Sequence, residues 1–397
     1  MLTQIDCKGK LISAATSGSY TFVGLATDQV RCFNWKTGRL VRGYECHAGP
    51  VTCILLSADR RHMYTGSWDR MILKIAIQEK ALSTTTIFAT GPNETSHDDF
   101  VKAMIFGPGE EVIYSASGDG KVYSWPIGEH ARALAATDSS SQEVSPYLIP
   151  KVLQVSKRAV ESLCLLPLAA DGHTLIAATT SDNAVVIIDG TTMVVVYTLK
   201  RHPSNVQHVR FAGELLWTAC ADNTIRAFEL PLDLFRIEGL GVPEERQKRE
   251  TLALQRETLI HSLDVGDWVL DWDFTDDESL LNKQGYIVVG LRNKRLLFLG
   301  LAGGLQVVRS QKKFFDGVSA VNVVYQMISH ITGEVPTLMV VCASWDHFIR
   351  RFYCDPDHED ENTEISDVSL SDSEESRRIV QEIQDARLRA MLQPDDA

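Results

Sequence analysis

The sequence predicts an all-β fold made of seven repeated units. Three observations support this prediction. A fixed spacing of polar residues recurs along the chain, short runs rich in β-branched residues accompany each recurrence, and long runs with helical periodicity are scarce before residue 370. At 397 residues the chain could otherwise form two or three ordinary domains.

The repeated frame is clearest in two neighbouring stretches. In the first, His47 precedes a valine by four residues and Asp69 by twenty-two, and in the second, His97 precedes a valine by four residues and Asp119 by twenty-two. Each turn acid follows a run of small residues and precedes a short apolar strand. The anchors of the seven units are Asp28, Asp69, Asp119, Asp182, Asp222, Asn293 and Asp346. The last six are each preceded by a valine that opens an alternating apolar run: Val51, Val101, Val160, Val206, Val269 and Val318.

Residues 1–354 resemble the WD-repeat family of β-propellers, whose units of about forty residues carry an early His and an Asp in a tight turn. In that family each unit is a four-stranded antiparallel blade. The Trp-Asp dipeptide that names the family is eroded here, because Trp125 is the one Trp at the expected place, six residues after an anchor. The resemblance implies a seven-bladed propeller with blades at approximately 9–46, 47–90, 97–156, 157–200, 202–264, 265–311 and 312–354.

Residues 2–8 are predicted to close the ring. The seventh unit supplies three strands of its own, at Val318–Gln326, Thr337–Ser344 and Phe348–Tyr353. An open strand edge would expose unpaired backbone groups. The alternating segment Leu2–Lys8 can become the outer strand of that blade, and propellers that resemble this chain commonly close in this way.

The resemblance also implies an architectural use for the polar frame. His47 would pair with Asp69, and His97 with Asp119, in a buried relay completed by a hydroxyl group. The sequence leaves that hydroxyl open among Thr65, Ser67, Ser115 and Ser117. A Ser-His-Asp triad is the alternative, but a constellation that repeats around a ring points to no single catalytic centre. Phosphate-loop, nucleophile-elbow and His-Glu-x-x-His motifs are absent from the sequence. We therefore expect no catalytic residue, no enzyme activity, no cofactor and no small-molecule substrate.

Eight cysteines are scattered along the chain without a Cys-x-x-Cys pair or clustered histidines. This distribution predicts buried thiols of the core and no metal site. Reduced thiols fit a cytoplasmic or nuclear location. The sequence contains no apolar run of membrane-spanning length and does not begin with a secretion signal, so we expect a soluble intracellular protein without membrane insertion.

A partner-binding surface is predicted on one face of the ring. In the family, residues just before the turn acid and residues just before the first strand of a blade surround the central channel on this face. Large aromatic residues and Arg dominate interface energies. Our hypothesis is a partner protein lying across Trp68, Trp345 and Trp268, with Phe100 and Arg292 at its border. The alternative, that each Trp packs against a neighbouring blade, stays open.

Two further segments depart from the repeat. The insertion Leu230–Gln255 contains Val-Pro-Glu-Glu followed by charged helix formers, which predicts a short helix or a long hairpin at the ring edge. Such an insertion is either a binding surface or a solvated excursion. A shorter serine-rich insertion spans Asp138–Ser145.

Residues 355–397 form an acidic tail with fourteen acidic residues and four arginines, which gives it ten of the thirteen net negative charges. Residues 355–373 are predicted to be disordered, and residues 374–392 to form an amphipathic helix that docks on the ring or on a partner. Ser369 and Ser371 each precede an acidic residue by three positions, a pattern typical of acidophilic kinase targets, so the protein is a possible phosphoprotein.

The sequence as a whole favours a non-catalytic protein-protein interaction scaffold, a subunit or adaptor of a multiprotein complex. One alternative is a nuclear assembly factor in ribosome biogenesis or chromatin complexes. Another is a substrate receptor of a ubiquitin ligase, which would show Trp-Asp-x-Arg where this chain has Trp125-Pro126 and Phe228-Glu229. Dispersed Lys and Arg residues and a net charge of −13 argue against direct nucleic-acid binding.

Overall fold

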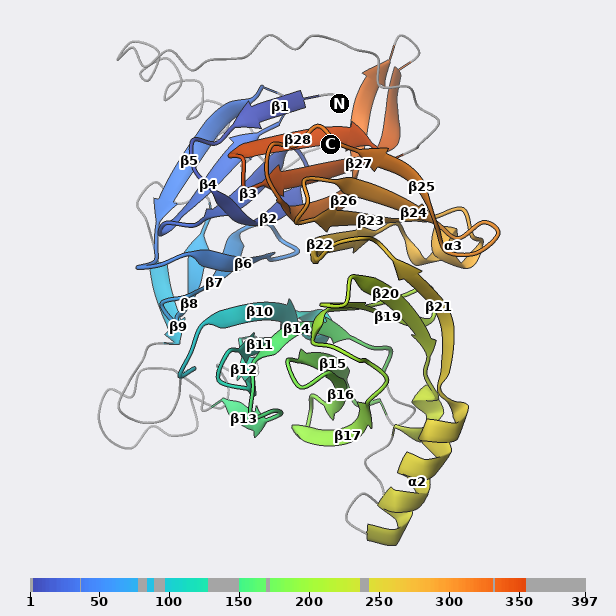
Figure 1. The fold of residues 1–397 in the computed structure, drawn as a ribbon. Helices are drawn as coiled ribbons and strands as arrows, with labels where there is room; N and C mark the ends of the chain where they lie inside the picture. Colours follow the sequence, from blue (N-terminus) through green and yellow to red (C-terminus); the bar gives the residue numbers. More distant parts are fainter. Residues whose placement is uncertain are drawn as a thin grey trace, which may run out of the picture.

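Seven four-stranded antiparallel sheets are arranged radially around a central channel (Figure 1). The computed structural model describes residues 3–35, 37–77, 84–88, 97–127, 150–168, 172–235, 243–330 and 333–354. The predicted all-β, seven-bladed propeller is confirmed. The acidic tail 355–397 with its predicted helix, Ser369 and Ser371, and the insertion Asp138–Ser145 lie outside the described residues.

The blades are numbered in chain order and each consists of strands that follow one another in sequence. Blade 1 contains β2 (Leu11–Ser17), β3 (Tyr20–Leu25), β4 (Gln29–Asn34) and β5 (Arg39–Glu45). Blade 2 contains β6 (Val51–Leu56), β7 (His62–Ser67), β8 (Ile72–Ala76) and β9 (Thr84–Phe88). Blade 3 contains β10 (Val101–Phe106), β11 (Val112–Ser117), β12 (Lys121–Pro126) and β13 (Lys151–Gln154). Blades 4 and 5 contain β14 (Val160–Leu165), β15 (Leu175–Thr180), β16 (Ala184–Asp189), β17 (Val194–Leu199); and β18 (Val206–Ala212), β19 (Leu215–Cys220), β20 (Thr224–Glu229), β21 (Thr258–Asp264). Blades 6 and 7 contain β22 (Val269–Phe274), β23 (Tyr286–Leu291), β24 (Leu296–Gly300), β25 (Gln306–Gln311); and β26 (Val318–His330), β27 (Gly333–Ser344), β28 (Phe348–Tyr353), with β1 (Thr3–Asp6).

The N-terminal strand β1 closes the ring, as predicted. It pairs antiparallel with β28, with Thr3 opposite Arg351 and Asp6 opposite Phe348. The backbone N–H of Cys7 then donates to the carbonyl of His347 at 2.8 Å. Strands from the two ends of the described chain thus share one sheet, so the ring holds together through hydrogen bonds rather than through a covalent closure.

Small residues on the second strand of a blade set the distance to the next blade. Gly66 on β7 and Gly290 on β23 each lie three residues before a turn anchor. A Cβ atom on Gly66 would lie 2.7 Å from Val101 Cγ1 of the next blade and 2.8 Å from Cys53 Sγ. At Gly290 it would lie 2.7 Å from the carbonyl oxygen of Val318. The opening valine of one blade therefore packs directly on the backbone of the blade before it.

The innermost strand of each blade has one edge with no neighbouring strand, and side chains from the preceding blade bond to the backbone along it. Ser13 Oγ donates to the Val51 carbonyl at 2.9 Å, and Thr52 Oγ1 donates to the Val101 carbonyl at 2.5 Å. Equivalent bonds run from His208 Nε2 to the Val269 carbonyl at 3.1 Å and from Ser319 Oγ to the Leu11 carbonyl at 2.8 Å. Each of these four carbonyls belongs to the first residue of an inner strand, so one polar contact recurs at four blade junctions.

At the junction of blades 6 and 7 the same edge is bonded by carboxylates. Asp271 Oδ2 accepts from the N–H of Val321, and Asp273 Oδ2 accepts from the N–H of Val323, both at 2.8 Å. Burial is the main cause that raises the pKa of Asp271 to about 7, and the neighbouring Asp273 adds to it. Burial also raises the pKa of Asp273.

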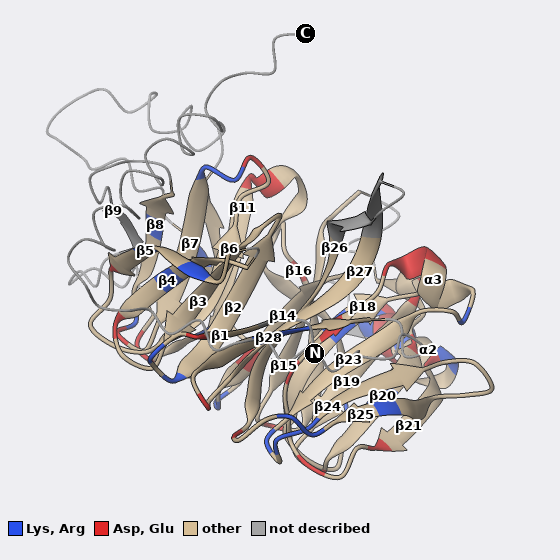
Figure 2. Cartoon of the chain, turned by 90° about the horizontal axis from the view of Figure 1, so that it is seen from above, with Lys and Arg blue, Asp and Glu red and all other residues tan. Residues whose placement is uncertain are grey.

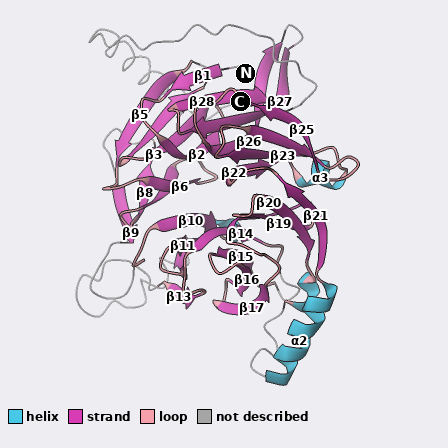
Figure 3. Ribbon diagram, viewed as in Figure 1, coloured by secondary structure: helices cyan, strands magenta, loops and turns pink. Residues whose placement is uncertain are grey.

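Three segments extend the propeller (Figure 3). The insertion in blade 5 forms α2 (Pro243–Arg256), so the predicted helix or hairpin is a helix. It projects on the outside of the ring, held at its C-terminal end by buried Ala253 and by ion pairs of 2.8 and 2.9 Å between Arg256 and Asp233. A short helix in blade 6, α3 (Asp277–Leu281), was not predicted, and its first turn is capped by Asp276.

The third segment is the hairpin of β26 and β27, which is longer than predicted. The sequence predicts strands that end at Gln326 and begin at Thr337, but pairing continues to His330 opposite Gly333. Pro336 and Gly333 both lie within the paired ribbon, opposite Met327 and His330. The hairpin of blade 7 therefore has twelve cross-strand pairs.

All eight cysteines are free thiols, and burial raises the pKa of Cys32 and Cys164 to about 12. Among the described residues, no group of three or more His, Cys, Asp or Glu side chains could hold a metal ion. No helix in the described ranges is long and apolar enough to cross a membrane. Acidic and basic residues are interspersed over strands and loops (Figure 2).

The contact of Gly66 with the next blade predicts a large cost for a single added methyl group. We expect Gly66→Ala to lower the free energy of unfolding by about 1–3 kcal/mol, because the new Cβ overlaps Val101 and Cys53. Gly43→Ala is the matched control, since a Cβ at Gly43 meets no atom within 4 Å. Urea unfolding of both variants measures the difference. Equal stabilities of the two variants would show that blade spacing is not set at Gly66.

The raised pKa of Asp271 predicts a characteristic pH dependence of stability. Between its ordinary value of 3.8 and about 7, the folded protein keeps a proton that the unfolded chain has released. Stability from this group therefore falls as the pH rises through that window. Asp271→Asn removes the titrating group and keeps an oxygen that can accept from the Val321 N–H. The free energy of unfolding of this variant, relative to that of the natural protein, should therefore increase by at least about 1 kcal/mol from pH 4 to pH 7.

Chemical denaturation across this pH range measures the difference, and the same substitution at the exposed Asp264 is the control. If the two curves for Asp271→Asn and the natural protein run parallel, Asp271 is not the group that titrates.

Candidate functional site

The histidines of blades 2 and 3 form buried relays with the turn acids. His47 Nδ1 lies 2.8 Å from Asp69 Oδ2, and His47 Nε2 lies 2.8 Å from Thr65 Oγ1. His97 Nδ1 lies 3.0 Å from Asp119 Oδ2 and its Nε2 lies 2.7 Å from Ser115 Oγ. Trp125 Nε1 donates to that same hydroxyl at 2.7 Å. Each relay thus uses both ring nitrogens of its histidine and fixes the turn above the blade.

The relays also settle which hydroxyl groups take part. Thr65 and Ser115 complete them, whereas Ser67 and Ser117 donate to the carbonyls of Gly49 and Asp99 in the adjoining loops. Burial raises the pKa of Asp69 and Asp119, but their hydrogen bonds outweigh it, so both pKa values lie below the ordinary range. Both carboxyls are therefore charged at neutral pH and engaged within their own blades.

In blades 5 and 7 the turn acid pairs with an arginine four residues later. Arg226 Nη2 lies 2.6 Å from Asp222 Oδ2, and Arg350 Nη1 lies 2.8 Å from Asp346 Oδ2. Arg350 is fully buried between the rings of Phe314 and Phe348, each about 5.0 Å from its guanidinium carbon. The sequence analysis missed these arginines, although an Arg four residues after an anchor was a visible signal.

The remaining anchors have other surroundings. In blade 4, Asp182 accepts a hydrogen bond from Ser156, which lies in the loop before the first strand. In blade 1, the backbone carbonyl of Asp28 accepts from the N–H of His47 at 3.1 Å. Asn293 in blade 6 is exposed. The seven turns thus share a position in the blade and differ in the side chain that holds them.

One backbone hydrogen bond repeats on a single face of the ring and brings two classes of residue together. In blades 2 to 7, the residue before the turn anchor donates its N–H to the carbonyl of the residue before the first strand of the same blade. We call this the top face. The bonds are Trp68 to Pro50, Gly118 to Phe100, Ser181 to Ala159, Ala221 to Asn205, Arg292 to Trp268 and Trp345 to Gly317, at 2.8–3.1 Å. In blade 1, Ala26 donates to Lys10 at 2.9 Å.

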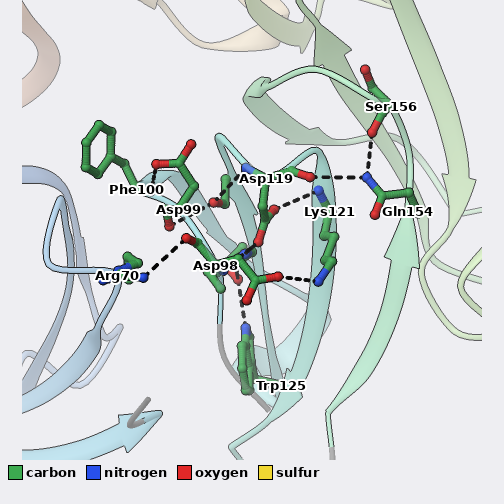
Figure 4. Close-up of polar contacts among 12 residues, drawn as sticks. Arg70, Asp98, Asp99, Phe100, Asp119, Lys121, Trp125, Gln154 and Ser156 are labelled. Carbon is green, nitrogen blue, oxygen red and sulfur yellow. Dashed lines mark hydrogen bonds and ion pairs between the residues drawn. The ribbon is translucent and has the colours of Figure 1, made fainter. Parts of the chain in front are cut away.

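Trp68 and Phe100 form a stacked pair across blades 2 and 3. Their ring centroids are 4.7 Å apart with an angle of 14° between the planes, and the side chains are 50% and 39% exposed. Beside them, Lys121 Nζ pairs with Asp98 at 2.7 Å, and Arg70 Nη1 donates to the Asp98 carbonyl at 3.4 Å. Figure 4 shows the Phe100 ring lying away from this polar network.

Two further aromatic residues of the top face are paired with cations. The guanidinium of Arg292 lies 4.3 Å from the Trp268 ring and Arg292 Nη2 lies 3.1 Å from Asp267 Oδ1. Lys10 Nζ lies 4.3 Å from the ring of Trp345, which is partly buried. The structure thus joins Trp68 with Phe100 and Trp268 with Arg292, and it places Trp345 with Lys10 between blades 7 and 1.

Sequence reasoning did not identify Lys10 or Arg70 as members of this surface. It also missed Phe315, which is 76% exposed in the loop before blade 7. Phe315 lies three residues before Val318, outside the two residue classes that the analysis used, so only its hydrophobic character could have drawn notice.

The relay geometry predicts that anchors differ in their contribution to stability. We expect Asp119→Ala to lower the free energy of unfolding by about 1–3 kcal/mol, because it leaves the buried His97 ring and the Asp98 N–H without their acceptor. Asn293→Ala changes the corresponding exposed position of blade 6 and should stay within about 0.5 kcal/mol. Urea unfolding compares them, and an equal loss in both variants would contradict the relay account.

Comparisons with known proteins agree with this geometry. A family model described as "WD domain, G-beta repeat" matches residues 38–73 and 92–126. An uncharacterized WD repeat-containing protein of Schizosaccharomyces pombe is 28% identical over 222 residues, which cover 53% of each chain. The chain thus spans about half the length of the curated relative that it matches. Residues 38–73 and 92–126 are thus WD40 repeats, and the described residues form a seven-bladed β-propeller with four strands in each blade.

Proposed function

We propose that this protein is a non-catalytic scaffold, a subunit or adaptor of a multiprotein complex, that binds a partner protein through its top face. WD40 propellers commonly bind proteins and are generally non-catalytic. The observation that carries the proposal is the exposed stack of Trp68 on Phe100. Solvent-exposed aromatic pairs on a rigid support are the side chains that most often dominate interface energies.

Rigidity of the support favours binding at this stack. The N–H of Trp68 is bonded to Pro50, and the carbonyl of Phe100 accepts from Gly118, both at 3.1 Å. Each ring therefore stands on a backbone that is already fixed, and the stack restricts both side chains before a partner arrives. Little conformational entropy remains to be lost on association, so more of the contact energy appears as affinity.

The surroundings of the stack fit the rim of an interface. Lys121 and Asp98 form an ion pair beside the aromatic rings, and Arg70 reaches the same loop. Polar rims around apolar centres are typical of protein-protein interfaces. Trp268, covered by Arg292, provides a second aromatic position on the same face, and Trp345 with Lys10 provides a third. The top face thus offers three separate contacts to one large partner surface.

The acidic residues 355–397 are proposed as a second handle for partners, on their sequence alone. Their fourteen acidic residues favour a basic partner surface, and phosphates on Ser369 and Ser371 would increase that preference. We place the protein in the cytoplasm or the nucleus on the basis of its free thiols.

The test compares partners retained by variants of the full chain. Trp68→Ser with Phe100→Ser removes the stack, and Leu259→Ser with Ile260→Ser removes two apolar side chains of similar exposure from the outer strand β21. Affinity purification from cells with quantitative mass spectrometry should show that the first variant loses at least about tenfold of one or more partners. The second variant should retain them.

Thermal unfolding of both variants checks that each is folded. Unchanged recovery of every partner by the folded Trp68→Ser, Phe100→Ser protein would remove the top-face stack from the binding account. Loss of the same partners by the β21 variant would move the interface to the outer edge of blade 5.

A further inference from the structure

A cavity of about 320 Å³ lies on the face opposite the top face. The inner strands begin at the top face, and this cavity is lined by residues near their far ends. Its walls include Thr16, Leu55, Leu56, Phe106, Asp273 and Asn322. These residues come from the inner strands of blades 1, 2, 3, 6 and 7.

The two sides of the cavity differ in chemistry. Leu55, Leu56 and Phe106, from blades 2 and 3, form an apolar wall. The opposite side carries polar groups from blades 1, 6 and 7. Thr16 Oγ1 donates to Asn322 Oδ1 at 3.1 Å. Asp273 also lines the cavity, and its carboxylate accepts from the Val323 N–H. A ligand that fills this space needs an apolar stem and a polar head.

Charges near the polar side are unbalanced. Asp271 and Asp273 lie two residues apart on β22, so they point to the same side of that strand. Among the described residues, the cation that acts on both carboxyls is Arg210, whose Nη2 lies 3.2 Å from Asp273 Oδ1. Half of the Arg210 side chain is exposed, so it can turn away without opening the core.

The other titratable groups of the inner strands do not correct this imbalance. Glu161 pairs with Lys102 at 2.7 Å, and burial lowers the pKa of His208 to about 4, so His208 is neutral at pH 7. Glu161 and Lys102 offset each other. Among the described groups of the inner strands, Asp271, which burial keeps partly protonated at pH 7, and Asp273 share one cation, Arg210. Burial is the main cause of the raised pKa of Asp271, and the neighbouring Asp273 adds to it while Arg210 opposes it.

We propose that this cavity binds an arginine side chain of a partner peptide, with the aliphatic stem against Leu55, Leu56 and Phe106 and the guanidinium at Asp273. A guanidinium supplies a second positive charge beside Arg210 and several N–H donors in one plane, which match a carboxylate. The methylene stem suits the apolar wall, since long cationic side chains bury their stems and direct their charge toward polar groups. The site lies on the other side of the ring from Trp68 and is independent of the proposed top-face interface.

Butylguanidinium is the probe, because it contains a guanidinium and a short aliphatic chain. Butylurea has the same shape without the charge and serves as its control. Leucine methyl signals of Leu55 and Leu56 in the full chain report occupancy by NMR. Butylguanidinium should shift both signals saturably, and butylurea should bind at least about tenfold more weakly, because the charge contributes 1.4 kcal/mol or more.

Two variants locate the site. Asp273→Asn keeps an acceptor for the Val323 N–H and should weaken butylguanidinium binding at least about tenfold. Leu55→Trp fills the cavity without changing any charge and should abolish the saturable shift at Leu56. Leu259→Trp, on the exposed strand β21, is the matched control and should bind as the natural protein does.

Three outcomes would overturn the proposal. These are equal binding of butylurea, unchanged affinity of a folded Leu55→Trp protein, and methyl shifts spread over the molecule instead of centred on Leu55 and Leu56. If Asp273→Asn fails to fold, the measurements with butylurea and with Leu55→Trp still show whether the cavity binds a cation.

Discussion

The unpaired inner edge of the seven central strands is the constraint on which this ring depends. Backbone groups along a free strand edge must find partners, and a buried group without one costs about 1–3 kcal/mol. Here side chains of the preceding blade supply them, as Ser13 does for Val51 and Thr52 does for Val101. Each of these hydrogen bonds joins two blades and also gives a partner to a carbonyl group on the free strand edge. The same valines pack on glycine backbone, so neither the spacing nor the order of the blades can change independently.

This constraint explains why the channel has an uneven charge. A hydroxyl group bonds to an inner-edge carbonyl and adds no charge, whereas an inner-edge N–H needs an acceptor. At the junction of blades 6 and 7 the acceptors are the carboxylates of Asp271 and Asp273. These carboxylates accept from the N–H groups of the inner edge but place acidic groups in a buried position, where Arg210 pairs with Asp273. The junction of blades 6 and 7 therefore favours a cationic ligand, whereas the junctions that use hydroxyl groups do not.

The repeat in the sequence predicted the fold because spacing reports local geometry. A turn acid twenty-two residues after a histidine fixes two strands and the loop between them, so the number of blades and the closing strand followed from the chain alone. The side-chain contacts between residues that are distant in the sequence could not be predicted from this spacing. Nothing in the spacing says that Trp68 turns toward Phe100, that Arg350 replaces a histidine at Asp346, or that Gly333 and Pro336 lie within a paired ribbon. These depend on tertiary neighbours, which a single sequence does not specify.

The two faces therefore offer different physical means of recognition. On the top face, Lys121 pairs with Asp98, and Arg292 pairs with Asp267 while covering Trp268. Since these charges are neutralised within the protein, what the top face presents to a partner is mainly aromatic area, and salt should affect it little. On the opposite face, the cavity places Asp273 across from the apolar wall of Leu55, Leu56 and Phe106, so charge is the feature that distinguishes this site from the top face. If both proposals hold, one rigid ring selects one partner by shape and another by charge.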